Sequence, residues 1–470
     1  MLITPNVAII SFFDNLFVNE NEEIGKPSFW EKLWSGQYWI DQIYGREKVS
    51  VNVWNNDLQI SGLENGKQQV IVKIIDGQIP TLIDDFEDIE IDYIYNESGF
   101  QYIKVTIPKD DIAQGFWGNL LFHRETLAGK SYISKVSLNQ QMSLVKPLDY
   151  ADENDIARTT YNLCEDYGIL DLPYSGHGIF IAVLDTGVKR DHDGLTDLDL
   201  YNESFVVDEN WEDHNGHGTH CIGILAGSNT TINGEQMRGV APNATVYSLK
   251  VLDSKGRGCE ADIIAGVMRA VDIGVDIISM SLGGSIDYFS SLHDAIHYAV
   301  GKGIIVVAAA GNSANVVSSQ PASWEGVISV EALDERKHIA EYTCLGGDVS
   351  AEGTNITSLS YKNDNRTSTK SGTSMSTPFV AGCIALLLEA QPSLRGKPYK
   401  AIEQIKTTGN YAPENTESIN WFIIPAASDN YAYDTREINP KYLVDLKVVS
   451  DKSKQILSDI WTNMLRESDV

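Results

Sequence analysis

Two short segments place residues of catalytic type next to apolar runs. Residues 181–184 are apolar and end at Asp185, a carboxylate that needs a positive or hydrogen-bonding partner if the run is a buried strand. His217 lies between glycines at the start of a small-residue stretch, where a helix would leave its imidazole accessible. Taken alone, Asp185 is as consistent with a structural cap as with catalysis, so the interpretation depends on what else the chain offers.

Two further segments offer a nucleophile and an oxyanion donor. Ser374 lies just before an apolar helix that is predicted to run to residue 388. A serine in the first turn of a helix sits at the positive end of the helix dipole, beside a free backbone N–H. Asn312 follows the apolar run 304–310, and its amide is placed to donate to an oxyanion. Each feature alone is an ordinary cap or loop residue, but the four together indicate acyl transfer.

The two histidines of the second segment, His217 and His220, have other interpretations, as a metal pair or as surface residues. A zinc protease motif of the common kind needs a glutamate beside the first histidine and a four-residue step to the second. This segment has neither. A metal pair is therefore not the favoured interpretation.

These segments resemble the three signature segments of the subtilisin family of serine proteases. They read Asp185-Thr186-Gly187, His217-Gly218-Thr219-His220 and Gly372-Thr373-Ser374-Met375-Ser376-Thr377-Pro378. The order Asp, His, Ser along the chain is also that of the family. Residues 281–284 and 309–312 match as well, and the resemblance covers about residues 160–445.

The resemblance implies a serine endopeptidase that hydrolyses peptide bonds in proteins or peptides. Ser374 would attack the scissile carbonyl, His217 would move the proton, and Asp185 would orient and stabilise the imidazole. The side chain of Asn312 and the N–H of Ser374 would form the oxyanion hole. The alternative from another functional class is a non-catalytic binding or sensor protein on the same scaffold.

The resemblance also implies where a substrate binds. An extended substrate would pair as an added strand with residues 281–283, and residues 309–311 would line the pocket for the residue before the cut. The two segments are Ser281, Leu282 and Gly283, and Ala309, Ala310 and Gly311. Ser319 is expected near the bottom of that pocket. No acidic residue is placed there, so a strict preference for basic residues is not indicated.

The sequence departs from the family at positions that bear on metals and on a thiol. Residues 227–238 differ from the usual high-affinity calcium loop, and Gly194 stands where an Asp is common. No cofactor is expected; calcium is left open, but the family's usual calcium site is not recognisable. Cys221 directly follows His220, as in two branches of the family, and is either a mercurial-sensitive thiol or a buried, inert one.

Charge and composition exclude several classes of partner. The 470 residues are 43% hydrophobic and 21% charged, which is typical of a globular protein. There are 36 basic and 65 acidic residues, a formal charge of −29, which argues against nucleic acid or an anionic membrane as the partner. No window approaches 18 consecutive apolar residues, so a membrane-spanning helix is not expected.

The chain is expected to be cytoplasmic. Its first eighteen residues are apolar, but Asp14 interrupts them, no Lys or Arg precedes Lys26, and no small-residue cleavage site follows. The five cysteines are few, odd in number and scattered, unlike a disulfide framework or a zinc ligand set.

The fold predicted for residues 160–445 is α/β, with a mostly parallel sheet flanked by helices. Short, uniformly apolar runs are typical of strands that are buried on both faces, and helix-like stretches separate them. The runs are residues 179–184, 246–252, 275–280 and 304–310, and the helical stretches are residues 261–273 and 291–302.

The flanking regions are predicted as separate parts. Residues 1–137 are predicted as a β-rich domain. Segments that alternate in polarity occur over about 46–137, for example at 68–75 and 103–107, and a sandwich is one arrangement. Residues 138–159 are predicted as a linker, and residues 446–470 as an amphipathic helix that packs on the protease or binds a partner.

The role of the first 150 residues is left open among an accessory, an inhibitory and a partner-recruiting domain. They differ from the family's short inhibitory propeptide, an α/β domain of about half that length. Their acidic stretch at residues 84–92 is either a calcium loop or, as its alternation favours, one solvated strand face.

Overall fold

The computed structural model describes ten parts of the chain. They are residues 68–85, 90–97, 100–107, 131–145, 147, 157–284, 290–315, 318–362, 366–408 and 424–425. All of them belong to one compact unit, residues 59–432. Three predicted parts lie outside the described residues. They are the predicted β-rich domain before residue 68, the end of the protease domain at residue 445 and the C-terminal helix at 446–470.

The first described part is an antiparallel sheet with a short helix. Its strands stand in the order β2-β3-β1-β4. The elements are β1 (Gln68–Ile75), α5 (Ile79–Asp85), β2 (Glu90–Glu97), β3 (Phe100–Ile107) and β4 (Ile133–Leu138). The β-rich character was predicted. The acidic stretch at 84–92 divides between the end of α5 and the start of β2.

Alternation along these strands produces two buried faces. Val70, Val72 and Ile103 pack with Leu82 of α5 in a core of their own. The opposite face carries Ile71 and Tyr102, which belong to a different core.

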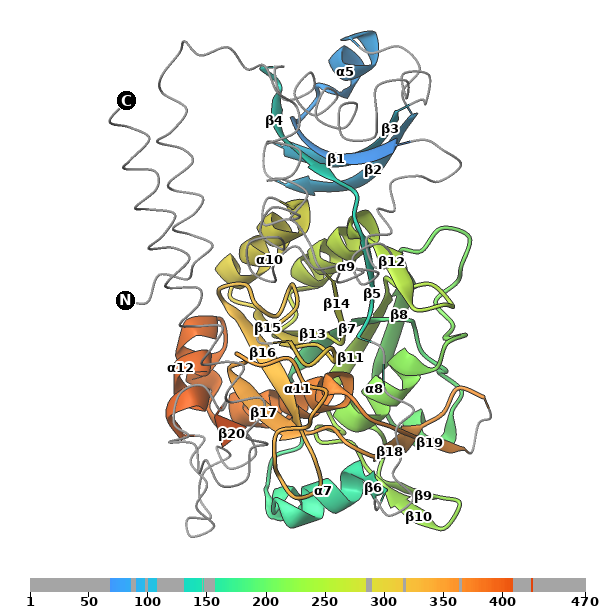
Figure 1. Cartoon of the computed structure of the whole chain (residues 1–470), viewed down its shortest axis with the longest axis vertical. Helices are drawn as coiled ribbons and strands as arrows, with labels where there is room; N and C mark the ends of the chain where they lie inside the picture. The colour runs from blue at the N-terminus through green and yellow to red at the C-terminus, as the bar shows by residue number, and fades with distance from the viewer. Residues whose placement is uncertain are drawn as a thin grey trace, which may run out of the picture. The chain divides into compact units, whose positions relative to one another are not determined.

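That second face lies on two helices, α9 (Glu260–Ile273) and α10 (Ser291–Gly301) (Figure 1). The hydroxyl of Tyr95 donates to Asp272 Oδ1 at 3.1 Å. Lys135 Nζ donates to Asp294 Oδ2 at 2.7 Å. Among the described residues, a helix pair therefore covers this face, where a sandwich would have a second sheet.

The larger part is the predicted α/β domain, built on an eight-stranded sheet of order β20-β17-β16-β15-β13-β7-β11-β8. All its strands are parallel except β20. They are β7 (Phe180–Asp185), β8 (Leu200–Ser204), β11 (Thr245–Lys250), β13 (Ile277–Met280), β15 (Ile305–Ala309), β16 (Val327–Leu333), β17 (Val349–Glu352) and β20 (Ile424–Pro425). The four predicted strands and two predicted helices occur within two residues of their expected bounds.

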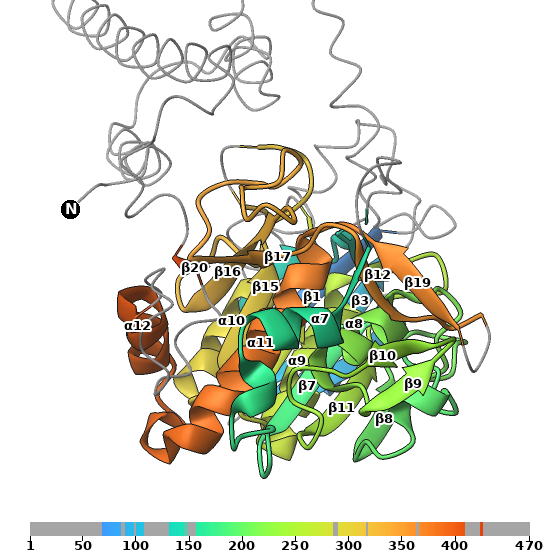
Figure 2. The ribbon, with the colours of Figure 1, turned by 90° about the horizontal axis from the view of Figure 1, so that it is seen from below.

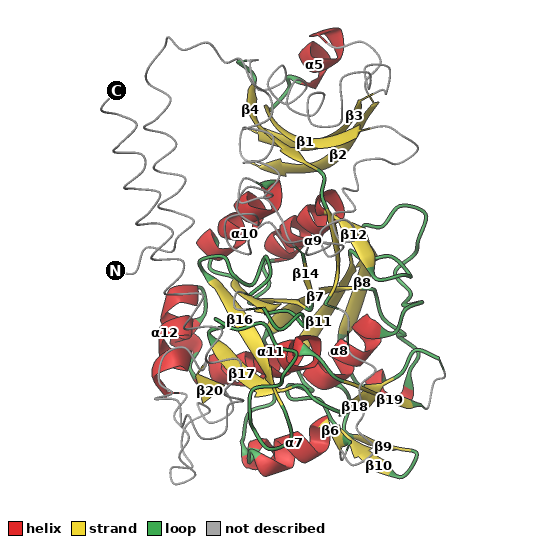
Figure 3. Cartoon of the chain, in the orientation of Figure 1, coloured by secondary structure: helices red, strands yellow, loops and turns green. Residues whose placement is uncertain are grey.

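Helices cover both faces of this sheet, which is why its strands are apolar throughout. Ala182 and Leu184 of β7 face the core formed with α9 and α10. Ile181 and Val183 face the core formed with α8 (His217–Ala226) and α11 (Thr373–Ala390). Figure 2 shows α8 and α11 on the near side of the sheet, and Figure 3 shows the same layers by element type.

Helix α11 lies at the centre of the second layer. By length and composition alone it could cross a membrane, but 89% of it is buried inside the protein. It packs against β13, β15, β16 and β17, as a core helix does.

Smaller elements close the periphery of the domain. Strands β6, β18 and β19 form one small sheet, and the hairpin β9–β10 occupies the 227–238 segment. Their bounds are β6 (Arg158–Thr159), α7 (Thr160–Asp166), β9 (Thr230–Ile232), β10 (Glu235–Met237), β18 (Ile356–Leu359), β19 (Thr367–Lys370) and α12 (Pro398–Thr408), with 3-10 turns at Ile169–Asp171, Asp193–Leu195 and Pro392–Leu394.

The segment predicted as a linker contains a strand, β5 (Gln141–Leu144). It pairs antiparallel with β12 (Arg257–Cys259) on one side and with β14 (Leu282–Gly283) on the other. Its partners are far away in sequence, and the strand is short, so local patterning did not reveal it. Residues 141–144 are thus a strand held between two segments of the α/β domain.

Candidate active site

Asp185 and His217 meet at the carboxyl end of β7, an interior strand of the large sheet. Both oxygens of the Asp185 carboxylate lie close to His217 Nδ1, at 2.8 and 2.9 Å. The two side chains are only 2% and 1% exposed. A carboxylate can only accept, so Nδ1 carries the proton and Nε2 is left as the basic nitrogen. No described residue gives Nε2 a hydrogen bond.

The pKa of His217 reflects two opposing effects. Burial alone lowers it, because the charged imidazolium loses its water. The Asp185 carboxylate raises it, with a smaller contribution from Cys221, and the net pKa lies well above the ordinary value for histidine. The pair is thus arranged to accept a proton at Nε2.

Thr186 and Asp213 hold this pair in place. The N–H of Thr186 donates to Asp185 Oδ1 at 2.7 Å, and its hydroxyl donates to Asp213 Oδ1 at 3.0 Å. Asp213 also accepts from the N–H groups of Gly216 at 2.7 Å and Thr219 at 2.9 Å. This carboxylate therefore fixes the start of α8, and with it the backbone of the histidine.

Ser374 lies in the first turn of α11, and its carbonyl has an unusual set of partners. Pro378 stands four residues on and has no N–H, so the helix cannot satisfy the Ser374 carbonyl. Instead Ser281 Oγ donates to it at 3.0 Å and Cys221 Sγ at 3.5 Å. The proline thus releases a carbonyl by which side chains from other elements anchor the serine.

Asn312 lies beside the same helix start. Its Oδ1 accepts from the N–H and from the hydroxyl of Thr373, both at 2.9 Å, which fixes the orientation of the amide. A Cβ on Gly372 would lie 2.7 Å from Asn312 Nδ2, so only glycine allows this approach. The Ser374 N–H, in the first turn, has no intrahelical acceptor.

The end of β5 reaches the serine. The hydroxyl of Ser374 donates to the carbonyl oxygen of Val145 at 2.8 Å. The N–H of Val145 donates to the carbonyl of Ser281 at 3.2 Å, and that of Leu144 donates to Gly256 at 2.8 Å. Val145 is only 8% exposed. A chain segment thus lies against Ser374 in the manner of an extended substrate.

The six residues predicted to bind substrate divide between two segments. Leu282 and Gly283 form β14, which pairs with β5. Residues 309–311 lie at the end of β15, where Ser319 donates its N–H to the Ala310 carbonyl at 2.7 Å and its hydroxyl to Ala309 at 3.5 Å. Ser319 therefore borders the second segment.

The other two residues singled out in the sequence, His220 and Cys221, are buried. His220 is fully buried, and its Nε2 contacts the Ser368 carbonyl at 3.0 Å. Cys221 is 1% exposed, and burial raises the pKa of its thiol. Among the described residues, the side chains of Asp185, His217 and Cys221 are close enough together to hold a metal ion, all lying within 4.8 Å.

Sequence reasoning missed several contributors to this site. Val145 has no signal of its own, because only folding brings it to Ser374. The signal for Asp213 was available in its position four residues before His217. Lys250, a lysine that ends the apolar strand β11, was equally visible.

Comparison with known proteins agrees with the resemblance. Residues 176–419 match the model of the subtilase family. The chain is 37% identical over 227 residues to subtilisin DY of Bacillus licheniformis, which covers 47% of this chain and 80% of that protein. It is 38% identical over 222 residues to an intracellular serine protease of Paenibacillus polymyxa, covering 45% of this chain and 67% of that protein.

Among solved structures, fervidolysin from Fervidobacterium pennivorans is similar in fold, with a TM-score of 0.57 at 22% identity. The match covers 73% of this chain and 57% of fervidolysin. The family match spans more than half of the chain, and the similarity to subtilisin DY spans most of that protein. The chain therefore belongs to the subtilase family and is a serine endopeptidase that acts on protein substrates.

Proposed function

We propose that Asp185, His217, Ser374 and Asn312 carry out the hydrolysis. The observation that supports this most directly is the 2.8 Å contact between Ser374 Oγ and the Val145 carbonyl, with the Asp185–His217 pair buried in the same site. A nucleophile, a general base, a group that orients the base and a bound carbonyl are thereby present together.

In the proposed reaction, Ser374 Oγ attacks the carbonyl carbon and its proton passes to His217 Nε2. The oxyanion accepts from the Ser374 N–H and from Asn312 Nδ2. Collapse of the tetrahedral intermediate breaks the C–N bond, and the departing amine takes the proton from His217. Water then hydrolyses the acyl-enzyme by the same route and restores the serine. Asp185 stabilises the imidazolium in both steps.

We also propose that residues 68–145 inhibit the protease until the bond between Val145 and Lys146 is cut. Strand β5 fills the groove between β12 and β14, so it excludes other substrates while it is bound. The described residues of this unit form an antiparallel four-stranded sheet with one short helix, α5.

Docking of this unit is specific because it caps two helices of the protease. The N-cap residue of α9, Cys259, makes no side-chain cap of its own. Asn139 Oδ1 instead accepts from Ala261 N at 3.1 Å, in the first turn of that helix. At α10, Ser137 Oγ accepts from Ser291 N at 3.2 Å. Separation of the unit would expose both helix starts to water.

An occupied groove supports limited processing over general turnover as the role of this enzyme. A protease whose groove is filled by its own chain becomes active only after a controlled step. We further propose that it acts in the cytoplasm. All five cysteines are unpaired, four of them buried, and the similar protease of Paenibacillus polymyxa is named intracellular.

The assignment of Ser374 predicts covalent labelling by a fluorophosphonate. The wild-type chain is expected to be labelled and the Ser374→Ala variant is not, because the probe requires an activated serine. Ser376→Ala is a matched control on the same helix turn and is expected to retain labelling. If no label enters wild-type protein, before or after removal of residues 1–145, the binding or sensor alternative is favoured.

The assignment of Asp185 predicts a pH effect. Hydrolysis requires neutral His217, so kcat/KM rises with pH through a pKa that lies above the ordinary histidine value. In Asp185→Asn the raising influence is lost, so the acid limb of the profile is expected to move to lower pH. We expect kcat to fall by about 10⁴-fold, the scale known for a triad carboxylate. Asp191→Asn, an exposed control, should change neither quantity. An acid limb that does not move in Asp185→Asn contradicts the assignment.

The inhibitory role predicts a self-cleavage site. Purified full-length chain is expected to yield a fragment that begins at Lys146, by intact mass and N-terminal sequencing, while Ser374→Ala stays whole. Val145→Asp should slow cleavage at least tenfold, because it places an unpaired charge in a buried position. Ser143→Asp, on the exposed side of the same strand, should not.

Two outcomes would contradict this role. A recruiting or purely structural N-terminal unit predicts that uncleaved protein hydrolyses added peptides as fast as cleaved protein. Cleavage at another bond would show that β5 is not bound in the productive register.

The cytoplasmic location predicts recovery of the protein with soluble cell contents. Fractionation of the source cells with antibody detection tests this. Accumulation of the cleaved form in the medium would overturn it.

A further inference from the structure

We propose that Glu209 and Lys250 form a positioning pair that holds the substrate-binding strand β12 in register with the catalytic residues. Neither side chain touches the substrate strand or the reacting atoms. The inference rests on the proteolytic activity and concerns how extended substrates are held during it.

Lys250 ends strand β11 directly beside Asp185 of β7. Its side chain is 0% exposed, and Nζ donates to the carbonyls of Thr186 at 2.7 Å and of Leu252 at 2.9 Å. A buried ammonium is costly unless an anion faces it. Two carbonyls alone do not balance its charge.

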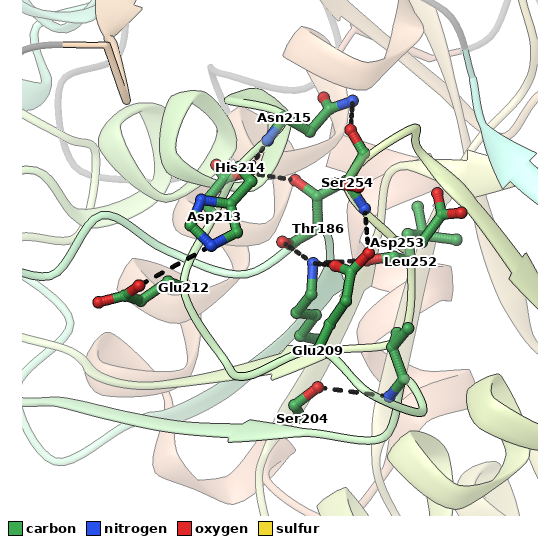
Figure 4. Close-up of polar contacts among 12 residues, drawn as sticks. Thr186, Ser204, Glu209, Glu212, Asp213, His214, Asn215, Leu252, Asp253 and Ser254 are labelled. Carbon is green, nitrogen blue, oxygen red and sulfur yellow. Dashed lines mark hydrogen bonds and ion pairs between the residues drawn. The ribbon is translucent and has the colours of Figure 1, made fainter.

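Glu209 supplies that anion from the loop between β8 and α8. Its Oε2 lies 3.1 Å from Lys250 Nζ, in the geometry of an ion pair rather than of an aligned hydrogen bond. Its Oε1 accepts from the N–H of Ser254 at 3.1 Å. Figure 4 shows the contact between the Glu209 carboxylate and Ser254, with Thr186 nearby. One carboxylate, from a loop about 40 residues earlier in the chain, therefore joins the buried lysine to the turn that follows it.

The Ser254 turn leads into the substrate groove. The carbonyl of Ser254 accepts from Asn215 Nδ2 at 3.3 Å. Two residues further, the Gly256 carbonyl accepts from the N–H of Leu144 at 2.8 Å, and β12 follows with its pairing to β5. A Cβ on Gly256 would lie 2.1 Å from Leu144, so this turn also shapes the space for the penultimate residue before the cut.

The other end of the network reaches the triad. Thr186, whose carbonyl Lys250 binds, gives its N–H to the Asp185 carboxylate at 2.7 Å. The same ion pair thus contacts the peptide after the triad aspartate and the turn before β12. Loss of the Glu209 charge would leave Lys250 uncompensated and free the Ser254 turn, so the groove would lose its fixed position relative to Ser374.

A positioning role and a purely structural role differ in their dependence on substrate length. A tetrapeptide with the sequence of Met142–Val145 contacts β12, whereas an ester of a single valine does not reach it. If β12 is displaced relative to Ser374, kcat/KM should therefore fall for the tetrapeptide and not for the ester. General damage to the fold or to the triad should affect both substrates equally.

The test compares acetyl-Met-Ser-Leu-Val p-nitroanilide with acetyl-valine p-nitrophenyl ester. It uses full-length chain that has completed self-cleavage after Val145 and has been separated from the N-terminal fragment, with active sites titrated by fluorophosphonate. In Glu209→Gln we expect kcat/KM for the tetrapeptide to fall about tenfold, mainly through KM, and that for the ester to change less than about twofold. Glu203→Gln, which breaks an exposed ion pair with Arg269, is the matched control and should change neither.

An equal loss on both substrates, or a ratio that matches the Glu203→Gln control, would overturn the proposal. If Glu209→Gln does not accumulate as folded protein, Glu209→Asp keeps the charge and shortens the reach to Ser254. The same ratio should then shift severalfold, and an unchanged ratio overturns the proposal. If the wild-type chain has no titratable sites, the failure is that of the proteolytic activity and not of this pair.

Discussion

A carboxylate at the end of a buried strand is the constraint on which the site depends. Asp185 closes an interior strand of the large sheet at 2% exposure, where an unpaired charge would be strongly destabilising. Its carboxylate is satisfied by the imidazole of His217 and the N–H of Thr186. Helix α8 must begin where His217 can reach the Asp185 carboxylate. Asp213 holds it there by accepting hydrogen bonds from the N–H groups of Gly216 and Thr219. The requirement to satisfy one charge therefore determines the position of several elements.

The parallel topology of the sheet brings the substrate-binding segments to the same edge as Asp185. Parallel strands expose their carboxyl ends at one edge, and residues that follow β7, β13 and β15 meet there. Helix α11 packs beneath that edge, and Pro378 leaves the Ser374 carbonyl to be anchored by Ser281 and Cys221. A buried thiol thus contributes as a weak donor, which favours the inert over the reactive interpretation of Cys221, since burial keeps it protonated.

How far the sequence predicted this structure depended on whether the signal was local. Apolar runs bounded by polar residues identified β7, β11, β13 and β15, because burial on both faces leaves a continuous run. The candidate catalytic residues were recognisable because Asp185 ends a strand and because His217 and Ser374 lie at the starts of helices. Strand β5 was taken for a linker, since four residues carry no period strong enough to identify a strand whose partners are over a hundred residues away. Helices α9 and α10 were predicted, but the packing of the N-terminal sheet on them was not, because alternation shows that a face is buried but not what covers it.

Tethering gives the N-terminal unit an advantage that a free inhibitor lacks. A segment attached to the chain meets its groove at a high effective concentration, so modest contacts are sufficient to keep it bound. In the proposed inhibitory role, that advantage is lost when the bond after Val145 is cut, and only direct contacts remain. They are chiefly the face with Ile71 and Tyr102 and the helix caps from Asn139 and Ser137. The strength of those contacts, and not the rate of the cut, then sets how quickly the groove opens to other substrates.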